Sequence, residues 1–165
     1  MSRKPPSHHW PARRQRAFTL VEIAVVVVIL GVLIALTLPG YRKIRLKSQA
    51  TAVTNDLRTF SAAFVNSNLQ NAGWPPGGFG PGNIPTTMAN ALTNTFTKPS
   101  PIGGKYEWIS NSTYKAAIGV TSDGADVLQN DLELLELVDR MIDDGNTSSG
   151  NVTISGPDLI YVIEP

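Results

Sequence analysis

The feature that most constrains this chain is an apolar run of 21 residues, from 18 to 38, that contains one acid, Glu22. As an α-helix the run rises ~1.5 Å per residue and reaches ~31 Å, which is the thickness of a bilayer's hydrocarbon core. A charge in that core costs roughly 2.5–3.5 kcal/mol even on insertion scales, so we expect Glu22 to have a partner that neutralises it. The run therefore predicts a membrane-spanning helix whose acid has a role beyond anchoring.

Basic residues flank this run on both sides. Residues 1–17 hold five of the chain's 14 basic residues and none of its 13 acidic ones. Residues 18–165 therefore carry a net charge of −4. Lys and Arg favour the cytoplasmic side and the first segment usually dominates, so we expect the N-terminus inside and the rest outside. A second basic group follows the run: Arg42, Lys43, Arg45 and Lys47. Lipid headgroups and acidic neighbours are both candidate partners for it.

Composition excludes several functions. The chain has no cysteine, and its only histidines, His8 and His9, precede the apolar run. Without those histidines the chain has no Ser–His or Cys–His catalysis and none of the usual zinc ligands. It has no glycine-rich phosphate loop, so ATP-driven work belongs to a partner. Because these catalytic groups are missing, we expect no enzyme. Because residues 18–165 carry net negative charge and would bind phosphate backbones poorly, we also expect no nucleic-acid partner.

The apolar run has two simpler interpretations. A secretory signal peptide has an apolar stretch of roughly 7–15 residues that a small-x-small cleavage site closes. This run is longer, lacks that site and carries a charge. A plain single-pass anchor is the stronger alternative.

A basic leader, then Phe-Thr-Leu-Val-Glu (residues 18–22), then an apolar helix with Pro39 near its end resembles type IV pilin-like proteins. That family includes pilus subunits and the pseudopilins of type II secretion. The resemblance implies that a prepilin peptidase cuts between Ala17 and Phe18 and that the new amino terminus is N-methylated. It also implies that Glu22 pairs with the amine of a neighbouring subunit. The family usually has glycine at the position of Ala17, and alanine is the closest residue in size.

The same resemblance implies partners and a location. The partners are a prepilin peptidase/N-methyltransferase, other pilin-like subunits, membrane lipid and an inner-membrane assembly platform with a separate ATPase. The location is the bacterial inner membrane, crossed once, with the head in the periplasm and a filament after assembly. Many adhesive pilins close a loop with a disulfide, whereas this chain has no cysteine. We therefore expect a structural subunit of a periplasmic filament for type II protein secretion. The alternative is a minor type IV pilin of a surface filament for adhesion, motility or DNA uptake.

Beyond Pro39 the apolar pattern becomes one stripe at helical spacing. The stripe consists of Leu46, Ala50, Val53, Leu57, Phe60 and Phe64. It predicts that the anchor continues as a single helix to about Gln70, kinked at Pro39. We expect four segments: a leader (1–17), a transmembrane helix (18–40), an amphipathic continuation (41–72) and a globular α+β head (73–165).

The head is expected to be a small antiparallel sheet on which the long helix packs, as in pilins. A loop rich in glycine and proline follows the helix, with Trp74 and Phe79 packed on the head. The expected elements are a short helix Thr86–Phe96, strands Lys105–Ile109 and Thr113–Val120 as a hairpin, a helix Asp126–Ile142, and strands Asn151–Ser155 and Leu159–Ile163. In the second helix Asp126 caps the start, and the side chains expected to face inward are Leu128, Leu132, Leu135, Val138 and Ile142.

Acidic residues gather along and after that helix. We expect the acids of the helix to face solvent, opposite the leucine stripe. The segment after it offers calcium ligands on a bending loop, namely Asp143, Asp144, Asn146 and Ser148. Some secretion pseudopilins resemble this in holding calcium in the C-terminal region of the head. The spacing of an EF-hand is absent, and a polar turn after a glycine-terminated helix is the interpretation that we favour. Calcium is the one cofactor that the sequence suggests.

Overall fold

The computed structural model describes residues 18–92 and 94–165. The chain divides into two compact units, residues 1–40 and 41–165. Helix α1 (Leu20–Asn71) contributes to both, and position 39 lies inside it. The kink expected at Pro39 stays a prediction.

The first unit is the apolar part of α1. Its large side chains are exposed, from 50% for Ile23 to 90% for Leu20. By length and composition, α1 is the one helix among the described residues that could cross a membrane. An exposed apolar surface of this size is stable in lipid but not in water.

In the second unit, the expected stripe of α1 faces the core of the head. All six of its residues are buried, none with more than 5% of its surface exposed. Since these side chains recur every three or four residues, they line one face of the helix. The predicted amphipathic continuation of the helix is therefore confirmed.

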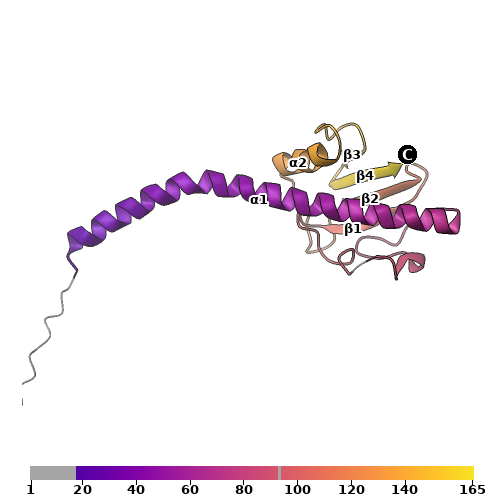
Figure 1. Ribbon diagram of the computed structural model, residues 1–165, viewed down its shortest axis with the longest axis horizontal. Coiled ribbons are helices and arrows are strands. Elements are labelled where there is room, and N and C mark those ends of the chain that lie inside the picture. Colours follow the sequence, from indigo (N-terminus) through magenta and orange to yellow (C-terminus); the bar gives the residue numbers. More distant parts are fainter. Residues whose placement is uncertain (1–17, 93) are drawn as a thin grey trace, which may run out of the picture. The chain divides into compact units, whose positions relative to one another are not determined.

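The sheet of the head has four antiparallel strands in the order β1-β2-β4-β3. They are β1 (Lys105–Ile109), β2 (Ala116–Thr121), β3 (Val152–Ser155) and β4 (Asp158–Glu164), as Figure 1 shows. In β1 the alternation is clean: Tyr106 and Trp108 are buried, whereas their neighbours are half-buried. The α+β fold with a small antiparallel sheet is as predicted.

Aromatic rings join α1 to the sheet. The Phe64 ring stacks on Trp108 of β1 with centroids 3.8 Å apart and planes 9° apart. Phe60 meets Tyr106 edge-on at 4.9 Å and Phe96 at 5.0 Å. Such pairs add about 0.5–1.5 kcal/mol beyond the area that they bury. These five buried side chains form the part of the core that lies between α1 and the sheet.

Loops of the chain itself cover the two edge strands. Along β1, the backbone N–H of Gly82 donates to the carbonyl of Tyr106 at 2.8 Å. Along β3, the N–H of Ile154 donates to the carbonyl of Thr147 at 2.9 Å. Backbone groups that an edge strand would leave unpaired are thus partly satisfied within the head.

The short helix expected over Thr86–Phe96 is wrong. Only a 3-10 turn, η1 (Thr86–Met88), forms there, and turns follow it; residue 93 lies outside the described residues. The apolar residues of the segment, Met88, Leu92 and Phe96, are nevertheless buried. Asn90 and Asn94 favour turns over a helix, so burial and not helical periodicity explains the spacing.

Two element starts were also wrong. Strand β2 begins at Ala116 rather than Thr113, because the side chain of Asn111 accepts hydrogen bonds from the N–H groups of Thr113 and Tyr114 and holds them in a turn. Helix α2 (Leu132–Ile142) begins six residues after Asp126, which exchanges two 2.9 Å backbone bonds with Asp123 instead of capping a helix. The expectation that Leu132 faces inward is also wrong, because it is the first residue of this shorter helix and is exposed.

Candidate functional site

The acid of the apolar run, Glu22, lies in the first turn of α1 and bonds to Thr19. Its Oε2 accepts hydrogen bonds from the Thr19 backbone N–H at 2.8 Å and from the Thr19 hydroxyl at 2.9 Å. The Thr19 hydroxyl oxygen in turn accepts from the Glu22 N–H at 3.2 Å. This reciprocal arrangement is a capping box, which satisfies N–H groups that the first turn would leave unpaired.

The sequence reasoning missed the role of Thr19. The signal was present, because Thr and Glu three residues apart before an apolar run are the signature of a capping box. Both bonds end on one carboxylate oxygen, and a carboxylate has lone pairs on two. Glu22 can therefore cap its own helix and still accept a further donor.

The other residues of the expected processing site are placed as follows. Phe18 precedes α1 and is 80% exposed. Ala17, the residue before the expected cut, lies outside the described residues. Of the residues before the helix, the structure describes Phe18 and Thr19, and both are exposed.

A second cluster lies at the end of α2. Carboxylate oxygens of Asp139, Asp143 and Asp144 all lie within 4.8 Å of one another. Asp143 and Asp144 were expected here, whereas Asp139 was expected on the solvated face. That expectation is wrong, because Asp139 is fully buried. It comes four residues after Leu135 and directly after Val138, and this spacing placed it on the buried face.

Asp139 is the unusual member of this cluster. Neither of its carboxylate oxygens has a hydrogen-bond partner among the described residues. Burial raises the pKa of Asp139, and the charges of Asp144 and Asp143 raise it further, while the nearby backbone N–H of Gly145 opposes the rise. An unpartnered buried carboxylate beside two others is a set of hard oxygen donors of the kind that calcium prefers.

The loop that follows is held by its own hydrogen bonds. Asp143 accepts from the N–H of Asn151 at 2.5 Å, and Asp144 accepts from the N–H of Asn146 at 2.7 Å. The side chain of Asn146 accepts from the N–H of Ser148 at 3.2 Å. The structure brings Asp143 and Asp144 to Asp139, whereas Asn146 and Ser148 contribute turn bonds of the expected polar kind.

Asp139→Asn is expected to stabilise the head at pH 7 without divalent cations, by on the order of 1 kcal/mol. The folded chain holds the Asp139 proton more tightly than the unfolded chain, so ionisation above about pH 4 costs stability that asparagine retains. The difference between variant and wild type should vanish below that pH. Urea unfolding with a chelator present, at pH 3.5 and pH 7, measures it. Asp144→Asn, at an exposed position, is the control and should gain less; an equal gain would contradict a role for burial.

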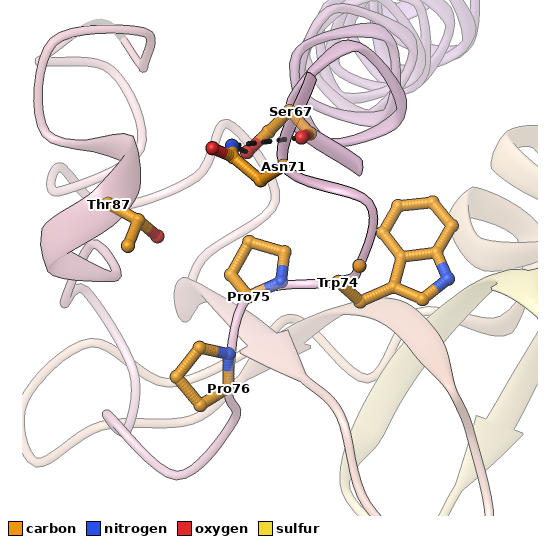
Figure 2. Close-up of a pocket in the computed structure, with 7 residues that line it drawn as sticks. Ser67, Asn71, Trp74, Pro75, Pro76 and Thr87 are labelled. Atoms are coloured by element: carbon orange, nitrogen blue, oxygen red, sulfur yellow. Dashed lines mark hydrogen bonds between the residues drawn. The ribbon is translucent and has the colours of Figure 1, made fainter. Parts of the chain in front are cut away.

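A pocket of about 190 Å³ lies where α1 ends. Figure 2 shows Asn71 bonded to Ser67 on one side, Thr87 opposite and the rings of Pro75 and Pro76 between them. The Trp74 ring points away from Thr87, and its Nε1 donates to Glu164 at 2.8 Å. None of the lining side chains titrates near neutral pH, so this pocket offers no acid or base.

Comparison with known proteins agrees with the motif at the start of α1. The family model of the prokaryotic N-terminal methylation motif matches residues 12–38. A type II secretion system core protein G from Klebsiella pneumoniae is 41% identical over 63 residues, which cover 38% of this chain and 45% of that protein. The chain thus spans less than half the length of this relative. A core protein G from Klebsiella michiganensis is 28% identical over 132 residues, 68% of this chain and 84% of that protein.

Pilins are similar as well. A type IV major alpha-pilin from Moraxella bovis is 44% identical over 43 residues, 26% of this chain and 27% of that protein. The solved structure of the major type IV pilin PilA1 from Clostridium difficile matches with a TM-score of 0.55 at 14% identity, over 73% of this chain and 97% of that one. The chain therefore has a prepilin-type N-terminal motif and the fold of a type IV pilin. Core protein G is a pseudopilin, so this chain is also similar in sequence to a pseudopilin.

Proposed function

We propose that this chain is a pseudopilin-like structural subunit that is processed by a prepilin peptidase and assembled into a periplasmic filament for type II secretion. The observation that carries the proposal is a prepilin-type motif whose single acid lies in the first turn of an apolar helix that continues into a compact head. The relatives named core protein G support secretion over a surface pilus.

In the proposed assembly, the apolar part of α1 leaves lipid and packs among the same part of neighbouring subunits. Apolar contact is retained in that exchange, so the move costs little. Cleavage before Phe18 would create an amine that can pair with the Glu22 of a neighbour. The capping bonds from Thr19 lower the cost of Glu22 in the unassembled subunit, and the remaining lone pairs accept the amine.

The proposed partners are a prepilin peptidase/N-methyltransferase, other pilin-like subunits and an inner-membrane platform with its own ATPase. The proposed topology is a single crossing of the inner membrane with the head in the periplasm. The basic leader supports this orientation. A structural role also fits a chain whose relatives are named as pilins and pseudopilin-type core proteins.

The mass of the intact chain and of its N-terminal peptide, from protein extracted from native membranes, tests this function. A chain that starts at Phe18 with one added methyl group supports it. A chain that keeps residues 1–17 overturns it and leaves a plain membrane anchor. Shearing whole cells then separates the two filament types, because a surface pilus is released into the medium and a periplasmic filament is not.

We further propose that the head binds calcium through Asp139, Asp143 and Asp144. The support is the buried, unpartnered carboxylate of Asp139 beside the other two. A bound cation would neutralise the repulsion within the cluster and satisfy the buried oxygens.

Calcium at 1 mM is expected to raise the Tm of the wild-type chain by several degrees, and magnesium by less. Asp139→Asn should abolish most of that rise while keeping the fold. Glu136→Gln, on the same helix but outside the cluster, is the matched control. Equal shifts for both variants, or none in the wild type, would exclude this site.

A further inference from the structure

The basic group that follows the apolar run has a use that the proposed function leaves unassigned. Lys43, Arg45 and Lys47 are exposed, and none of them pairs with an acid among the described residues. On the expected outer side of a membrane, such a group opposes the usual distribution of positive charge. It therefore calls for an anionic partner outside the chain.

The cations lie on more than one side of α1. At 3.6 residues per turn, Lys43 and Lys47 share one face, while Arg45 lies roughly on the opposite face. Arg42 lies between Arg45 and the buried stripe, and its guanidinium reaches Asp131 at 3.3 Å and Glu133 at 3.7 Å. A docked protein touches one side of a helix, whereas headgroups can reach every side that the head leaves uncovered. The distribution thus favours lipid.

The basic group also lies close to the lipid headgroup layer, judged by its distance along the chain from the apolar run. Tyr41 comes three residues after Leu38, so it lies within ~11 Å of the end of the apolar run whatever the angle between the two units. The headgroup layer on each side of a bilayer is roughly 5–7 Å thick, and long basic side chains extend to reach it. Residues 42–47 follow over ~8 Å of helix, close enough for their long side chains to reach back to that layer.

Apolar side chains of the head lie beside these cations. Arg42 pairs with the residues on both sides of Leu132, the first residue of α2, whose side chain is 58% exposed. On α1, Tyr41 is 68% and Ile44 is 71% exposed. Exposed aromatic and aliphatic groups among unpaired cations are the composition of surfaces that bind the membrane interface.

We propose that this membrane-proximal surface, made of Tyr41, Lys43, Ile44, Arg45, Lys47 and Leu132, docks the head on anionic phospholipid. Phospholipid phosphates pair with the cations, and the apolar side chains enter the interface. Docking fixes the head against the bilayer before assembly. The inference rests on the proposed function in one respect, which is that residues 18–38 span a membrane.

The absence of cysteine makes a direct test available, because one introduced cysteine is unique in the chain. The full chain carries a spin label at Asn130→Cys, an exposed position next to Asp131. It is reconstituted in vesicles of phosphatidylcholine with 30% phosphatidylglycerol, or of phosphatidylcholine alone. Relaxation by oxygen, which concentrates in lipid, is compared with relaxation by a water-soluble nickel complex. A label at Val28→Cys reports insertion of the apolar run separately.

The expected result is that the label at position 130 becomes oxygen-accessible only in vesicles with phosphatidylglycerol. Lys43→Gln with Lys47→Gln should shift the docking equilibrium about thirtyfold toward the free head. Lys98→Gln with Lys115→Gln removes the same charge elsewhere and is the matched control. Lys115 pairs with Glu164 at 3.2 Å between exposed groups, so this control should fold normally.

Each other outcome overturns the inference in a distinct way. If the label at position 28 is in lipid and the label at position 130 stays in water in both vesicles, docking is wrong and the anchor stands. If the label at position 28 is in water, the anchor itself is wrong. If position 130 is shielded only after other subunits are added, whatever the lipid, the partner is a protein. Equal loss with both lysine pairs would show that only net charge matters.

Discussion

Replacing Glu22 with glutamine is expected to leave the subunit in the membrane and to lower its incorporation into filaments by a hundredfold or more. Removing one member of a desolvated charge pair costs about 3–5 kcal/mol, because the partner is left buried and uncompensated. Glutamine has the shape of glutamate and is accepted in a capping box. The bonds to Thr19 are therefore retained, and only the charge changes.

Co-expression of the variant with wild-type chain, followed by quantification of both in cross-linked filaments, measures this loss. Thr19→Ala is the matched contrast, since it removes the hydroxyl of the capping box and keeps the charge. A cap is worth about 1 kcal/mol, so its loss should be several-fold only. Normal assembly of Glu22→Gln would show that the acid serves the helix start and not the neighbouring subunit.

Trp108→Ala is expected to destabilise the head by about 3–5 kcal/mol, a large part of the stability of a small domain. The indole is 1% exposed, stacks on Phe64 at 3.8 Å and donates from Nε1 to the carbonyl of Pro75 at 2.9 Å. Its removal leaves a cavity between α1 and the sheet and an unpaired carbonyl. Urea unfolding of residues 41–165, followed by circular dichroism, gives the value.

Trp74→Ala is the control for this substitution. Trp74 is half-buried and lies at the outside of the core, with its ring centroid 5.8 Å from that of Trp108. Its loss removes the bond to Glu164 and part of a contact, so we expect about 1–2 kcal/mol. Equal losses for the two tryptophans would mean that the stack on Phe64 does not organise the core.

The long helix could be predicted from periodicity, because helical spacing is read from residues that are close together in the sequence. The buried stripe from Leu46 to Phe64 needs only an apolar face and a head to cover it. The same holds for β1, where aromatic and half-buried residues alternate. Spacing alone also placed the acids Asp143 and Asp144 together after a helix.

The errors lie where distant parts of the chain meet. Residues 126–131 have a helical pattern, but the N–H of Gln129 donates to the carbonyl of Ile102 and that of Leu128 to the hydroxyl of Ser122. Those bonds hold the segment extended, and no local propensity describes them. Asp139 was misplaced for a different reason. At helical spacing it lies beside Leu135 and Val138, so the same periodicity that turns those two residues inward also turns Asp139 inward, whatever its charge.

The covered edges of the sheet restrict how copies of this chain can associate. Membrane proteins of one kind are crowded in two dimensions, where open strand edges would recruit one another into fibrils without a defined register. Here the N–H of Gly82 and the carbonyl of Thr147 already occupy positions along the two edges. Growth by strand addition is thereby disfavoured, and in the proposed filament the helix is left as the element through which copies would join. A polymer built that way can be taken apart again, which cross-β assemblies resist.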